Sequence, residues 1–480
     1  MPRPLGLLLV CVTLLGVAWA WFTPPWEGPD ETMHYGYVET LAQRHTRPGV
    51  ERGGNVLSTG QRLSMRGSNA DRLTHISDGR PQWSEAAARP FEQRSDVQRT
   101  DDGGFATKEG HVNTAKGNPP GFYVLELPAY AAGAAVGGVN SRLYAMRMFT
   151  IASLLLGVVA VWLLIGELVP RQPLAQLAGA ASVGLLPMST HIAASVNPDA
   201  LLYSLWAVVL WLGVRVLKRG LTLRSGLALV GALVAALAVK ATAVAVAPPV
   251  LGVLAYGLWK RPDVRARLGS LGRTRVRRVG LGLGTVVVGS GLAFVAATRY
   301  TSQLTEQLRG QFEPGLMASY LWQFYLPRLG FMQDIKTVTG IPVYDVWFKD
   351  LVGNFAWLQI SQPGWLYAVL AVLTVAVAAV GLVALWRDQP RSVVVFFAAV
   401  TVVLLAGLHI TDYRQAVVTG IGFMQGRYLL PLAGIFAAVL VAAWTRLPER
   451  RRPQATALLL GGLLALQIVS FSRAAGFWYV

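Results

Sequence analysis

Apolar residues along this chain are gathered into long runs, separated by short charged loops and by two long polar insertions. An α-helix rises 1.5 Å per residue, so about 20 apolar residues are needed to cross the hydrocarbon core of a bilayer. Eleven runs approach or reach this length, at residues 5–22, 142–165, 174–192, 199–216, 225–239, 241–259, 279–298, 363–386, 392–410, 428–445 and 455–473. We therefore predict an all-α integral membrane protein with a bundle of about 11 transmembrane helices.

The basic residues indicate on which side of the membrane each loop lies. Lys and Arg cluster after the runs that end at 216, 259, 386 and 445, and eight of them fall between Lys260 and Arg278. Cytoplasmic loops of membrane proteins carry an excess of these residues. We therefore place these loops in the cytoplasm, which requires that the runs 225–239 and 241–259 form a hairpin that turns outside.

The composition agrees with a membrane protein and excludes most soluble classes. Hydrophobic residues make up 53% of the chain and charged residues only 14%. The net charge of +18 lies mainly in short loops, without the interleaved aromatic and basic residues of a nucleic-acid surface. We therefore expect membrane lipids as partners and no nucleic acid. The single cysteine, Cys11, excludes a disulfide within the chain.

Two segments allow a second interpretation. The first run contains AWA at residues 18–20, which resembles a signal-peptidase site, but the run is long enough for a retained anchor. Residues 121–139 are long enough to span, yet a span here would move the loop 260–278 outside, so we expect a juxtamembrane or re-entrant helix. The expected parts are a first transmembrane helix (1–22), an extracytoplasmic loop with the juxtamembrane helix (23–141), a transmembrane core (142–298), a second extracytoplasmic loop (299–362) and C-terminal transmembrane helices (363–480).

This topology gathers the candidate chemistry on one face of the membrane. Of the 25 acidic residues, 13 lie between residues 23 and 120. The sequences PDETMH, SVNPDALLYS and MQGRYLLP fall on the same side, as do all six histidines: His34, His45, His75, His111, His191 and His409. We therefore expect a multi-pass protein of the cytoplasmic membrane whose active site is extracytoplasmic.

Asp30, Glu31 and His34 follow the first run closely and are the candidate catalytic residues. At spacings of four and three, a carboxylate and the imidazole reach one helix face. A carboxylate near lipid can have a raised pKa, which suits a general base. We expect Asp30 rather than Glu31 in that role because its shorter side chain is held more firmly in place. The alternatives are a helix start favoured by first-turn acids and a weak site for a divalent cation such as Mg²⁺. We predict no dedicated metal site and no obligatory cofactor.

Cations at the outer ends of the runs are the candidate substrate-binding residues. Positive charge is disfavoured there, so Lys240 and Arg427 predict a pocket for a phosphate or diphosphate, to which a guanidinium offers paired hydrogen bonds. Tyr428 adds a donor, and Arg147 is placed to join from its own run. The alternative is that these cations only reach to lipid phosphates.

Asp199 lies at the head of a predicted transmembrane helix on the same face. It follows Asn197 and Pro198, and helix capping by these three residues explains the pattern. Its position leaves a substrate-binding role open.

Together these motifs resemble a known family. PDETMHYGYV, SVNPDALLYSLWAVVLW, YLWQFYLPRLGFM and QGRYLLPL are similar, in this order, to bacterial membrane proteins grouped as domain of unknown function 2142. The early acidic motif, the Pro-Pro entry into residues 121–139 and RLYAMRMFTIASLLLG also resemble lipid-linked glycosyltransferases with the GT-C fold. The resemblance covers nearly the whole chain and implies a GT-C-like bundle with a large extracytoplasmic first loop.

The resemblance implies an enzyme that transfers a sugar from a polyprenyl-phosphate donor to a cell-envelope acceptor. In such enzymes an acid of the first outer loop acts as base or orients the acceptor, a role that maps onto Asp30 or Glu31. Asn118 stands before the Pro pair where many of these enzymes have a histidine, so that histidine's role does not carry over. Because the chain ends soon after its last run, we expect a lipid-held or glycan acceptor.

Two other functions stay open at this stage. One is a transporter or flippase of lipid-linked saccharides, although the runs hold few of the interior charges that transporters use. The other is a non-catalytic protein of envelope assembly, because a fold does not prove turnover.

Overall fold

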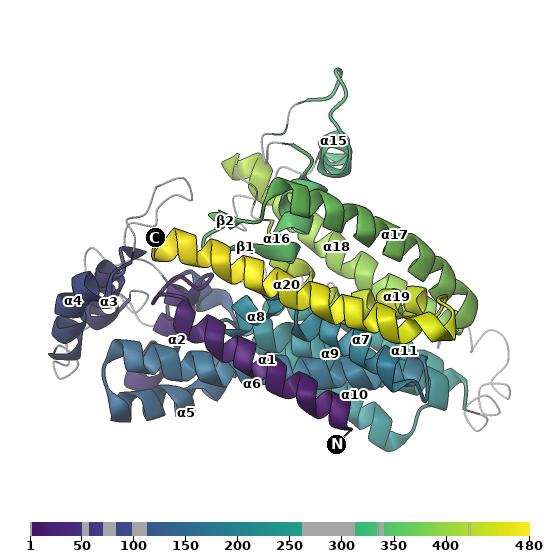
Figure 1. Cartoon of the computed structure of the whole chain (residues 1–480), viewed down its shortest axis with the longest axis horizontal. Helices are drawn as coiled ribbons and strands as arrows, with labels where there is room; N and C mark the ends of the chain where they lie inside the picture. Colours follow the sequence, from purple (N-terminus) through teal and green to yellow (C-terminus); the bar gives the residue numbers. More distant parts are fainter. Residues whose placement is uncertain are drawn as a thin grey trace.

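The computed structural model describes residues 2–49, 57–70, 83–97, 113–261, 313–333, 335, 340–420, 422 and 424–480. These residues form a bundle of long helices (Figure 1). The only strands among them are a short antiparallel pair, β1 (Asn354–Phe355) and β2 (Ile360–Ser361). The predicted all-α membrane fold is therefore confirmed over the described part of the chain.

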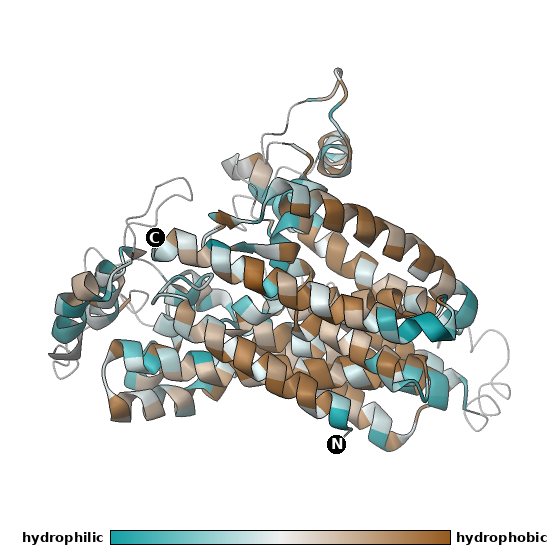
Figure 2. Ribbon diagram, in the orientation of Figure 1, coloured by the Kyte–Doolittle hydropathy of each residue, from teal (hydrophilic) through white to brown (hydrophobic). Residues whose placement is uncertain are grey.

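Eight helices of the described part are long and apolar enough to cross a membrane. Figure 2 shows hydrophobic residues along their lengths and hydrophilic residues gathered toward their ends. Each coincides with one of the predicted runs. They are α1 (Arg3–Phe22), α6 (Val139–Leu168), α9 (Pro198–Arg219), η4 with α11 (Ala241–Val246, Ala247–Trp259), α17 (Gly364–Asp388), α18 (Arg391–Thr419), η7 with α19 (Gly426–Leu432, Ala433–Trp444) and η8 with α20 (Glu449–Arg451, Arg452–Trp478).

The predicted run 174–192 is divided into two helices, α7 (Pro173–Gly184) and α8 (Pro187–Ala193). The break falls before Pro187, which has no N–H to donate to the preceding turn and therefore begins a new helix. The short α8 is completely buried and leads directly into the turn before α9.

Three further segments complete the comparison with the predicted runs. The run 225–239 forms α10 (Leu223–Val239), which has 17 residues. The segment 121–139 forms α5 (Gly121–Val136), a helix of 16 residues that packs along α6. The run 279–298 lies outside the described residues.

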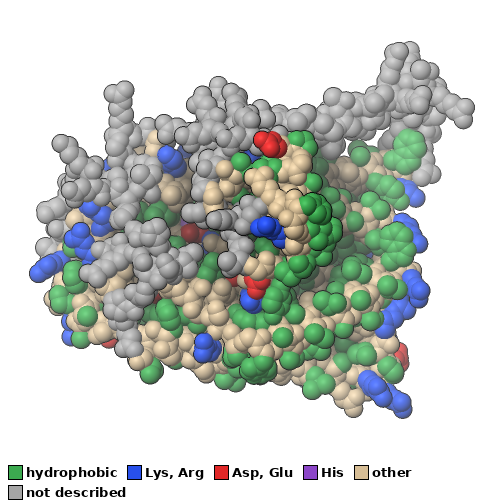
Figure 3. All heavy atoms as spheres, turned by 90° about the horizontal axis from the view of Figure 1, so that it is seen from above, with side chains coloured by type: hydrophobic (Ala, Val, Ile, Leu, Met, Phe, Trp, Pro, Cys, Tyr) green, Lys and Arg blue, Asp and Glu red, His purple; other side chains and the backbone are tan. Residues whose placement is uncertain are grey.

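The bundle is built around α6, which packs against α1, α5, α7 and α9 (Figure 1). The C-terminal helices join through α19, which packs on both α7 and α17. Large side chains such as Trp19 and Trp206 are completely buried between helices, whereas apolar residues of α17 such as Val372 point outward and are 70% exposed. The face in Figure 3 shows hydrophobic side chains across its middle and most of its visible Lys and Arg toward the two ends. This distribution suits helices that face lipid along their middle sections.

The helix ends sort into two groups, as the charge pattern predicts. At one end, which we call the basic end, Lys218 Nζ donates to the backbone oxygen of Glu167 at 2.6 Å and to Gln389 Oε1 at 3.3 Å. At the other end, which we call the site end, Asp199 at the start of α9 pairs with Lys240 before η4. The turn between α10 and η4 therefore lies opposite the basic loops, as the predicted hairpin requires.

The described parts of the two polar insertions form short helices. Two of them matter for the site: the first of these short helices packs on α5, and the last packs on η7 and α8. In chain order they are α2 (Glu31–Arg44), α3 (Thr59–Gly67), α4 (Glu85–Val97), η3 (Thr114–Gly117), α15 (Pro314–Tyr325), η6 (Val343–Phe348) and α16 (Lys349–Gly353).

Candidate functional site

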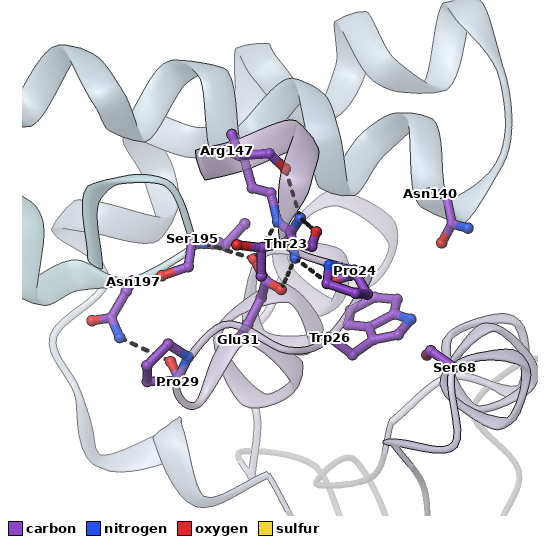
Figure 4. A network of polar contacts seen from close by, with 12 residues as sticks. Thr23, Pro24, Trp26, Pro29, Glu31, Ser68, Asn140, Arg147, Ser195 and Asn197 are labelled. Atoms are coloured by element: carbon purple, nitrogen blue, oxygen red, sulfur yellow. Dashed lines mark hydrogen bonds and ion pairs between the residues drawn. The ribbon is translucent and has the colours of Figure 1, made fainter. Parts of the chain in front are cut away.

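Glu31 and Arg147 form a completely buried ion pair at the start of α2 (Figure 4). Arg147 of α6 donates from Nε to Oε1 at 2.8 Å and from Nη2 to Oε2 at 2.6 Å, and the backbone N–H of Val196 donates to Oε1 at 3.1 Å. The other N–H groups of Arg147 donate to the backbone oxygens of Ala20, Thr23 and Pro24. All five guanidinium donors are thus occupied. The pair joins α1, α2, α6 and the turn before α9, and offers no group to a ligand.

Of the two adjacent acids Asp30 and Glu31, Asp30 is the one whose side chain is partly exposed to solvent. It precedes α2 with a left-handed backbone (φ 56°), and its side chain does not cap the helix. Its carboxylate is 43% exposed and accepts a hydrogen bond from Arg427 Nη2. The turn before it is held by Asn197 Nδ2, which donates to the backbone oxygen of Pro29 at 2.9 Å.

Asp30, Asp199, Lys240 and Arg427 form one group at the site end, which we call the charge cluster. Lys240 Nζ lies 2.5 Å from Asp199 Oδ1, and Arg427 Nε lies 3.9 Å from Asp199 Oδ2. The charged groups of both cations lie near the ring of Tyr428, at 5.6 Å and 5.4 Å from its centroid. The structure therefore brings these five predicted site residues together, and leaves Glu31 and Arg147 in a separate pair.

Arg427 keeps hydrogen-bonding capacity inside the charge cluster. The residue is only 4% exposed, yet its Nε and Nη1 have no hydrogen-bond partner in the described part of the chain, and neither does Asp199 Oδ2. Buried polar groups are nearly always satisfied by protein, water or a ligand. Open guanidinium donors beside Lys240 are the donors that a phosphate group binds.

The electrostatics of Asp30 differ from the sequence-based expectation. Partial burial alone would raise the pKa of the Asp30 carboxyl, but the Arg427 guanidinium, with Lys240 nearby, holds that pKa below its ordinary value. The expected rise toward neutrality is therefore wrong for this arrangement. The cause is an ion pair with a residue 397 positions away, which no local pattern reveals.

His34 borders the charge cluster from α2 and is 5% exposed. Burial is the main cause that lowers the pKa of its imidazole to about 4, against the opposing effect of Asp30. The ring is therefore neutral near pH 7. Its Nδ1 lies 3.0 Å from the Tyr123 hydroxyl, so the ring is oriented by α5 rather than by a hydrogen bond to Asp30.

Sequence reasoning missed Asp350 of α16, which holds the backbone before Arg427. Asp350 Oδ2 accepts from the Gly426 N–H at 3.1 Å, and Oδ1 accepts from Asn354 Nδ2 at 3.0 Å. Burial raises the pKa of this carboxyl to about 6. A side chain at Gly426 would clash with the Trp347 backbone oxygen, so this close approach requires glycine. No motif surrounds Asp350, and the glycine before Arg427 is the one local signal.

The Asp and His side chains at this site are not arranged as a set of metal ligands within the described residues. His34 borders the charge cluster, whereas His409 lies in a separate aromatic group where the Tyr325 hydroxyl is 2.7 Å from its Nε2. His75 and His111 lie outside the described residues. Over the described ranges, no group of three or more His, Cys, Asp or Glu side chains is placed to hold a metal ion.

Comparison with solved structures finds distant similarity to proteins that include the following two. ArnT from Cupriavidus metallidurans, bound to undecaprenyl phosphate, is 13% identical with a TM-score of 0.41, over 98% of this chain and 75% of that chain. The archaeal oligosaccharyltransferase AglB from Archaeoglobus fulgidus, in complex with an inhibitory peptide and a dolichol-phosphate, is 13% identical with a TM-score of 0.46, over 98% of this chain and 56% of that chain. Both scores lie below 0.5, so neither structure indicates what this chain does.

The remaining comparisons concern sequence. A search of curated proteins gives no match. A family described as predicted membrane protein (DUF2142) matches residues 13–436, a range that includes the whole charge cluster and far more than half of the chain. This agrees with the motifs in the sequence, and the chain therefore belongs to the DUF2142 family of predicted membrane proteins.

Proposed function

We propose that this chain is a membrane glycosyltransferase that transfers a sugar from a polyprenyl-phosphate donor to an acceptor at the extracytoplasmic face. The observation that carries the proposal is the charge cluster, in which two cations with little exposure lie beside one open carboxylate. This transfer needs positive charge for the phosphate leaving group and a carboxylate for the acceptor hydroxyl.

The reaction we propose is a single displacement with inversion at the sugar. The acceptor oxygen forms a bond to the anomeric carbon while the bond between that carbon and the phosphate oxygen breaks. Asp30 takes the proton of the acceptor hydroxyl. The phosphate leaves with the electron pair of the broken bond, and Arg427 and Lys240 balance its charge.

The pair of Asp30 and Arg427 suggests when the base becomes active. The guanidinium weakens Asp30 as a base because it lowers the pKa of that carboxyl. A donor phosphate competes with Asp30 for Arg427, whose Nε and Nη1 have no hydrogen-bond partner within the described residues. Once the phosphate holds Arg427, Asp30 loses its main counter-charge and its pKa rises. The base therefore strengthens when the donor is in place.

Two cations at the cluster supply the charge that a divalent cation supplies in many phosphate sites. We therefore propose a reaction without an obligatory cofactor. Turnover that is unchanged by a chelator supports this, whereas turnover restored only by Mg²⁺ contradicts it.

The proposed location is the cytoplasmic membrane, with the basic end in the cytoplasm and the charge cluster outside. A lipid-held or glycan acceptor then reaches the cluster from that side. Single cysteines test this in a Cys11→Ser background, because Ser84 and Arg450 are both exposed and lie on opposite sides in the proposed topology. Impermeant reagent should label Ser84→Cys in intact cells and Arg450→Cys only after permeabilisation; the reverse pattern contradicts the proposal.

The experiment that tests the function is incubation of purified protein with a panel of polyprenyl-phosphate sugars and candidate acceptors. We expect free polyprenyl phosphate to be released with one sugar and to depend on an acceptor. A flippase would instead move the donor between leaflets of a vesicle without release, and a non-catalytic protein would do neither.

A further inference from the structure

The hydroxyl of Tyr123 connects Asn118 to His34, which borders the charge cluster. Tyr123 of α5 is completely buried and stacks on Tyr37 of α2, with ring centroids 3.7 Å apart and planes 5° from parallel. Asn118 Nδ2 donates to its hydroxyl oxygen at 2.9 Å, and His34 Nδ1 lies 3.0 Å from the same oxygen. The ring position is therefore fixed by packing, and its hydroxyl by two polar neighbours.

The hydrogen-bonding pattern around Tyr123 favours one tautomer of the imidazole. The Tyr123 oxygen accepts from Asn118, and its single proton needs an acceptor because the hydroxyl is buried. Over the described residues, His34 Nδ1 lies at hydrogen-bond distance from this hydroxyl, and a bond donated by the hydroxyl requires that nitrogen to be unprotonated. A neutral imidazole carries one proton, so that proton lies on Nε2.

The surroundings of His34 favour the neutral ring. The ring is almost completely buried, and Lys240 and Arg427 both oppose a positive charge on it, while Asp30 and Asp199 favour one. Burial outweighs the acids. His34 is therefore a neutral ring at the border of a cluster that holds two cations and two carboxylates.

We infer that His34 is a neutral hydrogen-bond donor, through Nε2–H, to an uncharged sugar oxygen of the ligand at the charge cluster, and that Tyr123 and Asn118 are positioning residues that set its tautomer. The identity of the ligand rests on the proposed function. Charge decides which part of the ligand each group binds. Arg427 and Lys240 bind the phosphate, and a neutral N–H donates to a hydroxyl or ring oxygen. A cationic imidazole would instead compete for the phosphate.

Two substitutions of similar size separate the two ring nitrogens. The amide N–H of His34→Gln lies near the place of Nε2, and that of His34→Asn lies near the place of Nδ1. We expect the Gln variant to keep most of the transfer rate and the Asn variant to lose about two- to tenfold, the range for a hydrogen bond between uncharged groups. Equal rates for the two variants, or a faster Asn variant, overturn the inference.

The positioning roles have a readout that does not depend on activity. In protein labelled with ¹⁵N-histidine, the His34 signals are identified by their loss in His34→Gln. We expect Nδ1 of the wild-type ring to be unprotonated and Nε2 protonated at about pH 7. Tyr123→Phe keeps the stack on Tyr37 and should allow the other tautomer. A protonated Nδ1 in the wild type contradicts the inference even if transfer is found.

The transfer assay and the ¹⁵N-histidine spectrum together distinguish a failure of the proposed function from a failure of the role inferred for His34. If the wild type transfers no sugar under any condition, the proposed function fails while the spectrum still decides the tautomer. If transfer is found and the spectrum shows Nδ1–H, the role given to His34 fails and the glycosyltransferase stands.

Discussion

Asp30 and Arg427 lie 397 positions apart in the sequence and form an ion pair at the site end of the bundle. Asp30 ends the turn after α1, and Arg427 lies in η7 near the start of the penultimate membrane helix. The pair joins an open carboxylate to a buried guanidinium that has further donors to offer. An anionic ligand that binds Arg427 therefore competes with the carboxylate that we propose as base.

This competition predicts how the rate depends on pH. The Asp30 carboxylate acts in its ionised form, so transfer falls as the pH falls through its pKa. That pKa is lowered in the free protein, where Arg427 pairs with Asp30, and should be higher in the donor complex. The acid limb of kcat, which reports the complex, should therefore lie at higher pH than the acid limb of kcat/KM for the donor, which reports the free enzyme. If the acid limbs of the two pH profiles coincide, donor binding does not raise the pKa of Asp30, and the proposed competition for Arg427 is contradicted.

A conservative change at Arg427 tests the phosphate pocket. Arg427→Lys keeps the charge but loses the fork that makes paired hydrogen bonds, so we expect the donor KM to rise about tenfold or more. The matched control is Arg446→Lys at the basic end, where the side chain is 43% exposed and pairs with Asp388. The control should leave the KM unchanged. An unchanged donor KM in Arg427→Lys would contradict the proposal that the donor phosphate binds at Arg427.

Glu31 should behave as a structural residue. Glu31→Gln leaves the Arg147 guanidinium buried without its counter-charge, and breaking such a pair typically costs about 3–5 kcal/mol. We expect a clear loss of melting temperature and of folded protein, measured in detergent. Glu85→Gln makes the same chemical change at an exposed pair with Arg89 and should have no measurable effect. A stable but inactive Glu31→Gln variant would instead point to a catalytic role for Glu31.

Asp350 should act through the position of Arg427. Asp350→Ala removes the acceptor of the Gly426 N–H, so we expect the donor KM to rise about two- to tenfold with a smaller change in kcat. Asp350→Asn keeps an oxygen for that N–H and should stay close to the wild type. Equal losses in both variants would indicate that the charge of Asp350, rather than its hydrogen bond, is needed.

The fold could be predicted well from the sequence because a membrane imposes one requirement on every spanning segment. Runs such as 142–165 and 199–216 appear as α6 and α9 with nearly the expected bounds. The prediction of one helix over 174–192 is wrong. Counting apolar residues takes no account of Pro187, which lacks the N–H that a continuous helix needs at that position.

The site could be predicted only in part, because pairing between distant residues decides it. The sequence motifs named Asp30, Asp199, Lys240 and Arg427, which the structure brings together. The sequence motif kept Glu31 beside Asp30 as a candidate catalytic residue, since the partner that buries Glu31 lies 116 positions away. The same limit explains the wrong direction for the pKa of Asp30, which depends on which cation arrives beside it.

The most direct test of the account compares the wild type with Asp30→Asn and Asp30→Glu for acceptor-dependent release of polyprenyl phosphate, with donor binding measured separately. The account predicts that Asp30→Asn binds donor at least as well, because Arg427 is freed, yet transfers sugar roughly 10²- to 10⁴-fold more slowly, the range for a lost general base. Asp30→Glu should recover part of that rate. Transfer by Asp30→Asn at the wild-type rate, with the donor bound, would contradict the account.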